Sequence, residues 1–218
     1  LFILSTKLLI SQAVVNEFSA ANYDFFQDNY GEYEDWVELY NTSSSDIDLN
    51  GWYLSDKSTN ITKWQFPSSY IISANSTALI YCSGRDELIG GIAHTNFKIT
   101  QTKGNETFII ADATGAVIDS ISVLPHQKSH SRGRDVNGGS NWSVFSDLVT
   151  TPGANNNGAL LEYASTPSFS QPSGYYNSGV DIAINSPDPN VTIYYTVDGS
   201  MPDNTSLIYN SPVNITST

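Results

Sequence analysis

Short runs in which every second residue is apolar recur along the chain, and this spacing constrains the fold more than any other feature. In residues 35–40, Val37 and Leu39 alternate with polar or amphipathic neighbours, and similar runs occupy 14–19, 52–54, 64–66, 78–82, 107–111 and 117–123. Turn-forming pairs such as Asn50-Gly51 and Ser83-Gly84 separate the runs. No stretch has the apolar spacing of a long amphipathic helix. The pattern therefore predicts an all-β fold, an antiparallel sandwich or barrel.

The composition excludes several classes of protein. Charged residues make up 14% of the 218 residues and the formal net charge is −13. So few charged residues argue against a coiled coil, and a charge of −13 opposes binding to nucleic acid through phosphate contacts. Cys82 is the only cysteine, which excludes a disulfide framework and a cysteine-based zinc site. We expect it to be a small core residue.

The N-terminus is typical of a processing segment. Residues 1–10 are almost wholly apolar, and Ser11-Gln12-Ala13 follows, with small residues at the −3 and −1 positions of a cut after Ala13. We interpret residues 1–13 as the remnant of a secretory signal peptide, the alternative being an ordinary first strand. The run is too short to span a bilayer, so no transmembrane span is expected. Eight Asn-x-Ser/Thr sequences, such as Asn41-Thr42-Ser43 and Asn141-Trp142-Ser143, are glycan acceptors only in a host that glycosylates exported proteins. The predicted location is secreted or at the cell surface.

A domain boundary is predicted near residues 150–166. Residues 151–158 form a cluster rich in Pro, Gly and Asn, which breaks regular structure. We assign residues 14–156 to a first domain, 157–166 to a linker and 167–218 to a second domain. Residues 165–218 contain no Lys, Arg or His. Strands are predicted at 180–184, 191–197 and 213–216, with a hairpin turn at Asp198-Gly199.

Several motifs in the first domain resemble the lamin tail domain in its bacterial, secreted form. They are the segments 16–20, 35–41, 49–56, 64–67 and 80–84, then 94–98, 131–134 and 151–155. The resemblance covers residues 14–156 in order and implies an immunoglobulin-like β-sandwich. Trp52 and Trp64 are large enough to span the core of such a sandwich.

The second domain resembles the chitobiase/β-hexosaminidase C-terminal-like domain through residues 192–202 and 207–213. The resemblance implies a smaller β-sandwich without hexosaminidase catalytic residues. The last strands of that family are absent, so we expect the domain to be truncated. The pair of domains further implies a larger exported protein, in which a module such as a CotH-type kinase-like domain lies beyond Thr218.

The candidate chemical sites are weak. Six acidic residues between Asp24 and Glu38 could hold calcium, but the spacing is not that of an EF-hand, and we interpret the stretch as a solvated acidic loop. Paired carboxylates for a glycosidase would need a cleft. His126, His130 and Asp135 are expected in a polar loop with partly exposed imidazoles. Ser129 or Ser131 would complete a triad by composition only, because no nucleophile elbow is present. Arg132 and Arg134 are expected to pair with acids of their own domain. No catalytic, cofactor-binding or metal-binding residue is therefore predicted.

Aromatic residues in the second domain offer a further candidate. Tyr175, Tyr176, Tyr194 and Tyr209 could form a platform for sugar stacking, the alternative being packing against other structure. The sequence therefore predicts a non-catalytic binding or adhesion module of an exported protein. Its partner would be a protein or polysaccharide of the cell envelope or extracellular matrix. The alternative is the targeting or structural region of a secreted hydrolase or kinase-like enzyme whose active site lies beyond Thr218.

Overall fold

The computed structural model describes residues 12–216, and all its regular elements are strands. The chain divides into two compact units, Leu1–Glu162 and Tyr163–Thr218. Leu160 forms an isolated bridge with Val144, so the first part of the predicted linker belongs to the first unit. Most of the predicted signal-peptide remnant, residues 1–11, lies outside the described residues, and Ala13 begins the first strand.

The first unit is built on a seven-stranded sheet in the order β13-β12-β1-β2-β7-β9-β8. Neighbouring strands are antiparallel except for β7 and β9. The strands are β1 (Ala13–Ser19), β2 (Trp36–Asn41), β7 (Thr77–Tyr81), β8 (Glu87–Ile89), β9 (Ile92–His94), β12 (Ser131–Arg134) and β13 (Trp142–Phe145).

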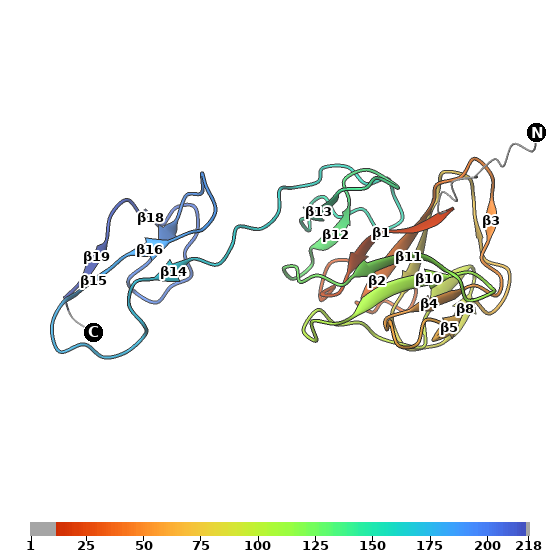
Figure 1. Ribbon diagram of the computed structural model, residues 1–218, viewed down its shortest axis with the longest axis horizontal. Coiled ribbons are helices and arrows are strands. Elements are labelled where there is room, and N and C mark those ends of the chain that lie inside the picture. Colours follow the sequence, from red (N-terminus) through yellow and green to blue (C-terminus); the bar gives the residue numbers. More distant parts are fainter. Residues whose placement is uncertain (1–11, 217–218) are drawn as a thin grey trace, which may run out of the picture. The chain divides into compact units, whose positions relative to one another are not determined.

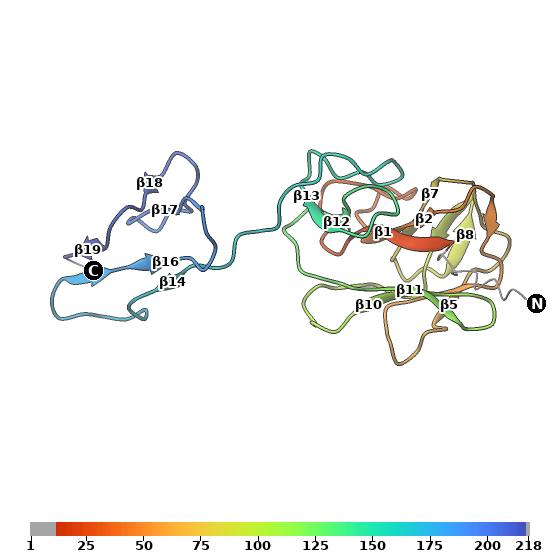
Figure 2. The same cartoon turned by 45° about the horizontal axis from the view of Figure 1, so that its top comes forward.

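A second sheet, in the order β11-β10-β4-β5, packs on the first. Its strands are β4 (Tyr53–Ser55), β5 (Trp64–Gln65), β10 (Thr107–Ala111) and β11 (Val117–Ser122), and a small ladder joins β3 (Ile47–Asp48) to β6 (Ile71–Ile72). Figure 2 shows the two layers, with β10, β11 and β5 on one side and β1, β2 and β12 on the other. This arrangement is the predicted immunoglobulin-like sandwich.

The core between the layers is formed by the apolar face of each strand. Val37 and Leu39 of β2 are fully buried, as the alternation predicts. Trp64 packs against Phe66 with ring centroids 4.7 Å apart, and Phe18 against Phe108 at 5.5 Å. Trp64 is 2% exposed, in keeping with the prediction that it spans the core, whereas Trp52 is only half-buried at its margin. Cys82 is buried in the same cluster.

The outer face of β1 and β2 is also covered, which the alternation does not reveal. The register of β1 against β2 shifts between Val15 and Glu17, and every residue of β1 is buried. Segment 151–156 closes over this face. Thr151 donates its hydroxyl hydrogen bond to Glu17 at 2.6 Å, and the Gly153 amide donates to Glu38 at 2.7 Å. The breaker cluster at the predicted domain end is therefore fastened to the first two strands.

The second unit contains three short two-stranded ladders (Figure 1). They are β14 (Ser168–Phe169) with β16 (Ile184–Asn185), β15 (Val180–Ile182) with β19 (Val213–Ile215), and β17 (Tyr194–Tyr195) with β18 (Leu207–Ile208). The predicted strand 191–197 is thus shorter than its alternation suggests. Among the described apolar residues of this unit, only Ile184 is buried. The unit is therefore an all-β module with a largely open interior.

Candidate functional site: an aromatic and acidic loop

The connection between β1 and β2 forms a loop, residues 22–35, whose two arms are tied together by Asn22. The Asn22 Nδ2 group donates hydrogen bonds to the carbonyls of Phe26 and Glu34, at 2.6 and 2.8 Å. Asp28 organises the tip, because its Oδ1 accepts hydrogen bonds from the amides of Tyr30 and Glu32. Asn and Asp commonly bond to nearby backbone in this way. The loop therefore holds its shape through its own polar side chains.

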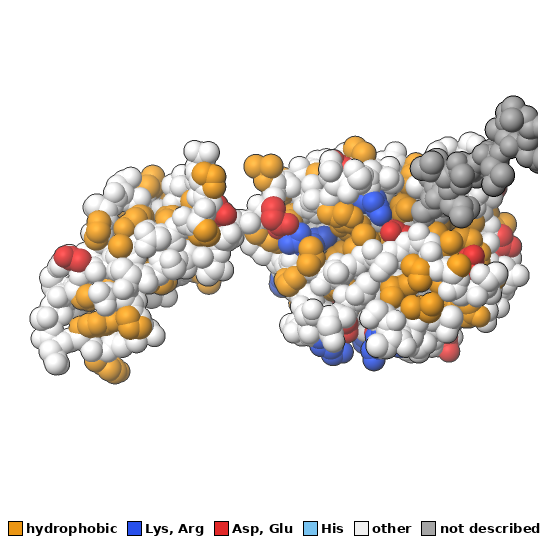
Figure 3. Space-filling model, viewed as in Figure 1, with side chains coloured by type: hydrophobic (Ala, Val, Ile, Leu, Met, Phe, Trp, Pro, Cys, Tyr) orange, Lys and Arg blue, Asp and Glu red, His pale blue; other side chains and the backbone are white. Residues whose placement is uncertain are grey.

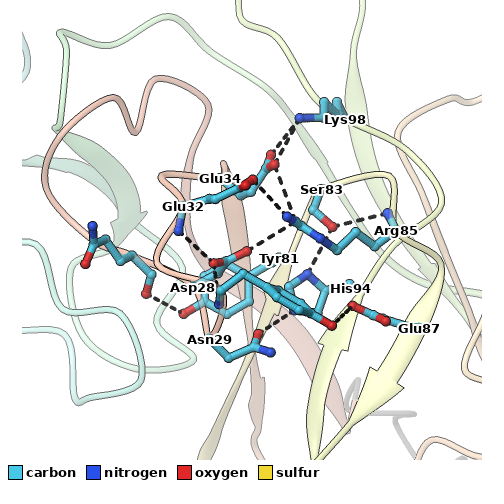
Figure 4. A network of polar contacts seen from close by, with 12 residues as sticks. Asp28, Asn29, Glu32, Glu34, Tyr81, Ser83, Arg85, Glu87, His94 and Lys98 are labelled. Carbon is cyan, nitrogen blue, oxygen red and sulfur yellow. Dashed lines mark hydrogen bonds and ion pairs between the residues drawn. The ribbon is translucent and has the colours of Figure 1, made fainter.

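Arg85, which follows β7, braces the loop from outside (Figure 4). Its guanidinium lies 2.8 Å from Glu32, 3.3 Å from Asp28 and 3.5 Å from Glu34. The same group lies 4.5 Å from the centre of the Tyr30 ring. A carboxylate as buried as that of Asp28 is costly without a cation, so Arg85 fixes both the charge and the position of the loop.

His94 lies beneath the loop and is fully buried. Its Nε2 lies 2.7 Å from Asn29 Oδ1, and its Nδ1 lies 3.0 Å from the Ser83 hydroxyl (Figure 4). The imidazole stacks on Tyr81 at 5.2 Å, and burial lowers the pKa of His94. Ser, His and Asn thus form a hydrogen-bonded chain. Because Ser83 and His94 are both buried, this chain supports the loop rather than presenting a nucleophile to solvent.

The loop presents aromatic side chains to solvent. Tyr23 is 68% exposed, Phe25 41%, Tyr30 47% and Tyr33 43%. Two contacts hold the Tyr30 ring: the Arg85 guanidinium lies over it, and its hydroxyl donates a hydrogen bond to Glu87 at 2.7 Å. The bond to Glu87 raises the pKa of Tyr30. Exposed aromatic groups gathered on one loop are typical of a binding surface. The sequence reasoning missed this feature, although aromatic and acidic residues already alternate with turn formers in residues 23–33.

The interpretation of the acidic stretch as a solvated loop is wrong for three of its six members. Asp28, Glu34 and Glu38 are buried. Asp28 and Glu34 pair with Arg85, and Lys98 binds Glu34 at 2.9 Å. For Asp28 and Glu34, the tertiary structure supplies these cations from another part of the chain, and the ion pairs offset the free-energy cost of burying the two carboxylates. Within residues 12–216, no group of three or more His, Cys, Asp or Glu is arranged to hold a metal ion.

Glu38 belongs to a second, buried network on the outer face of the large sheet. It accepts hydrogen bonds from the Asn16 side chain at 2.8 Å and from the Gly153 amide at 2.7 Å. Burial raises the pKa of Glu38 to about 8 and also raises the pKa of Glu17, its cross-strand neighbour. Asn156 joins the network through Asn16. All these groups are covered by protein, so the network fastens segment 151–156 to the sheet.

The histidine loop differs from the prediction in one residue. His126 is buried, and its Nε2 accepts a hydrogen bond from the Ala20 amide at 2.8 Å. Burial lowers the pKa of His126 to about 4. The triad is not assembled, since Ser129 donates to Asp24 and Ser131 to Glu17. Pairing with an acid of the predicted domain 14–156 is confirmed for Arg134, which binds Asp119 at 3.1 Å. Arg132 binds Glu162 at 2.6 Å, a residue of the predicted linker that the structure places in the first unit.

The predicted tyrosine platform of the second unit is brought together only in part. Tyr195 and Tyr209 meet edge to face at 6.5 Å, whereas Tyr175 is 98% exposed. Tyr194 lines an open apolar cavity of about 310 Å³, with Phe169, Ile182, Ile193 and Val213 among its other lining residues. On the face of this unit visible in Figure 3, hydrophobic side chains reach the surface and no Lys or Arg is present.

Family models agree with this architecture. The model of the Lamin Tail Domain matches residues 5–124, which is more than half of the chain. The chain belongs to the lamin tail domain family. The model of the Chitobiase/beta-hexosaminidase C-terminal domain matches residues 171–218. The resemblances to these two families are thereby confirmed, the first over residues 5–124 rather than 14–156, and the bacterial, secreted form stays a prediction. The lamin tail domain of this chain continues structurally past the matched range, because β12, β13 and segment 151–156 complete its large sheet and cover it.

Three further observations concern the chain as a whole. No curated protein matches the chain. Within the described part of the chain, there is no helix with the length and apolar character needed to cross a membrane. Of the two quoted Asn-x-Ser/Thr sequences, Asn141 is exposed, whereas Asn41 is buried and donates its side-chain amide to the Ile72 carbonyl. A glycan at Asn41 is therefore incompatible with the fold.

Proposed function

We propose that this chain is a non-catalytic binding module of an exported protein and that the loop 22–35 of its lamin tail domain contacts the ligand. The observation that carries the proposal is the exposure of Tyr23, Phe25, Tyr30 and Tyr33 on a loop that Arg85 holds in place. Large exposed aromatic groups usually mark a surface that another molecule covers. The ligand is a polysaccharide or a protein of the cell envelope or extracellular matrix.

Export is part of the same proposal. It is supported by the apolar residues 1–10 and the Ser11-Gln12-Ala13 sequence that follows them. A rigid β-sandwich that carries its binding residues on a loop suits such a module, because the scaffold fixes the loop while its side chains vary.

A depletion assay tests the proposal. The protein is mixed with insoluble polysaccharides and with cell-envelope fractions, and the protein left in solution is measured. The double variant Tyr23→Ala/Tyr33→Ala should lose binding to whichever fraction depletes the parent protein. The variant Tyr175→Ala, which removes a still more exposed tyrosine of the second unit, should bind as the parent does. Equal depletion of all three proteins would refute the assignment of the loop.

A second candidate is that the chain is the non-catalytic region of a longer enzyme. The match to the Chitobiase/beta-hexosaminidase C-terminal domain favours a glycosidase, and the resemblance-based alternative is a kinase-like enzyme beyond Thr218. Two experiments distinguish the glycosidase from the kinase-like enzyme. The coding sequence after Thr218 is determined, and the complete protein is assayed on hexosamine glycosides. Hydrolysis by the complete protein but not by residues 1–218 would support this candidate.

A further inference from the structure

The exposed rings of the loop 22–35 are interleaved with carboxylates. Asp24 separates Tyr23 from Phe25, and Glu32 immediately precedes Tyr33. Both acids reach solvent, with 55% of the Asp24 side chain and 58% of the Glu32 side chain exposed. Lys128 binds Asp24 and Arg85 binds Glu32, but both carboxylates stay more than half exposed, so a ligand that covers the rings also meets them.

Arg85 shows how this loop holds a cation. Its guanidinium lies over the Tyr30 ring, 4.5 Å from the ring centre, and bonds Glu32 at 2.8 Å. The negative face of an aromatic ring attracts a guanidinium, and a neighbouring carboxylate adds a charge-assisted hydrogen bond. Tyr23 is followed by Asp24, and Glu32 precedes Tyr33, so a ring and an acid are adjacent in sequence at two further places where the ring is exposed.

The charge of the loop favours the same kind of ligand. Residues 22–35 contain five carboxylates, and the cations that pair with them are Arg85, Lys98 and Lys128. Negative charge therefore remains in excess, as it does over the whole chain at −13. Such a surface repels anionic polymers and attracts basic ones. A neutral polysaccharide would use the rings but would gain nothing from the excess carboxylates.

We infer that the partner recognised by the loop 22–35 is a basic polypeptide segment, whose Arg or Lys side chains lie on Tyr23 and Tyr33 next to Asp24 and Glu32. This inference rests on the proposed function and names its ligand class. Tyrosine-rich loops on immunoglobulin-like sandwiches suit protein recognition because a tyrosine offers much contact area for two rotatable bonds. Asn22 and Asp28 already order the backbone, so little entropy is lost on binding.

The test uses the full chain and two synthetic peptides of one sequence. One peptide is rich in arginine, and in the other every arginine is replaced by neutral citrulline, which keeps the shape. We expect the chain to bind the arginine peptide in preference to the citrulline peptide. Tyr23→Ala/Tyr33→Ala should weaken binding of the arginine peptide about tenfold, from two lost cation–π contacts. Tyr175→Ala and Asp147→Asn, which remove an exposed ring and an exposed charge outside the loop, serve as controls and should change affinity less than twofold, about the limit of a binding measurement.

The outcomes separate this inference from the proposed function. If the loop variant binds the arginine peptide as tightly as the parent chain does, binding reflects the overall negative charge and the inference is overturned. If a neutral polysaccharide is bound through the loop and the arginine peptide is not, the inference fails while the proposed function stands. If no ligand depends on the loop, both fail. Unchanged tryptophan fluorescence of the variant shows that it is folded, because all four tryptophans lie in the lamin tail domain.

Discussion

The buried carboxyl of Glu38 should make the lamin tail domain less stable as the pH rises from 5 to 8. Burial raises the pKa of Glu38 from 4.5 to about 8, so the folded state binds this proton more tightly than the unfolded state does. The contribution to stability is complete below the unfolded pKa and is lost as the pH rises toward the folded pKa. Worked from these two pKa values, the loss between pH 5 and pH 8 is about 3 kcal/mol.

Glu38→Gln isolates this effect, because glutamine cannot ionise and has nearly the same shape. Urea unfolding of the parent chain and the variant is followed by tryptophan fluorescence at several pH values. The variant loses a hydrogen bond at every pH, so its absolute stability is not the readout. The difference in unfolding free energy between the two proteins should instead move by about 3 kcal/mol in the variant's favour from pH 5 to pH 8.

Burial also raises the pKa of Glu17 and lowers that of His94, and these groups, like the two that follow, are common to both proteins. Burial raises the pKa of Asp35 to about 6, which adds to the loss of stability as the pH rises. Burial lowers the pKa of His126 to about 4, which removes stability as the pH falls from about 6.5 toward 4. Asp147→Asn, a change at an exposed acid, is the control. A difference between parent and Glu38→Gln that stays constant with pH would refute the reasoning.

Three further predictions concern packing and charge. Trp64→Ala should lower the free energy of unfolding by about 3–5 kcal/mol in urea titrations followed by circular dichroism, because the indole fills the core; a loss under about 1 kcal/mol would contradict the packing. Arg85→Ala should cost about 2 kcal/mol and speed hydrogen exchange in residues 22–35, since Asp28 stays buried without its cation; unchanged exchange would show that the loop holds itself. Limited proteolysis should cut the second unit first and leave a fragment with native tryptophan fluorescence, because the second unit buries so little; simultaneous loss of both units would argue against this.

The acidic loop shows where sequence reasoning reaches its limit. Its acids are visible in the sequence, but the sequence does not say which of them lie under protein. Arg85 and Lys98 are more than fifty residues away from Asp28 and Glu34, and only the fold brings the charges together. The exposed rings of Tyr23 and Tyr33 could have been predicted from a turn-rich segment that carries aromatic residues, because such a segment has no strand in which to bury them.

The sequence alone determined the strand-rich sandwich, the aromatic core and the two families, because a period of two and well-placed turns restrict the chain to paired strands. Trp64 in the core follows from this local information. The acids that pair with Arg132 and Arg134 lie 30 and 15 residues away, so the fold selects them. The tertiary structure decided the fate of the outer face of β2. Alternation predicts that the side chains of Glu38 and Val37 lie on opposite faces of the sheet, but whether each side chain is buried depends on what covers its face. Segment 151–156 covers it from more than one hundred residues away, and this contact turns a surface carboxylate into a buried one.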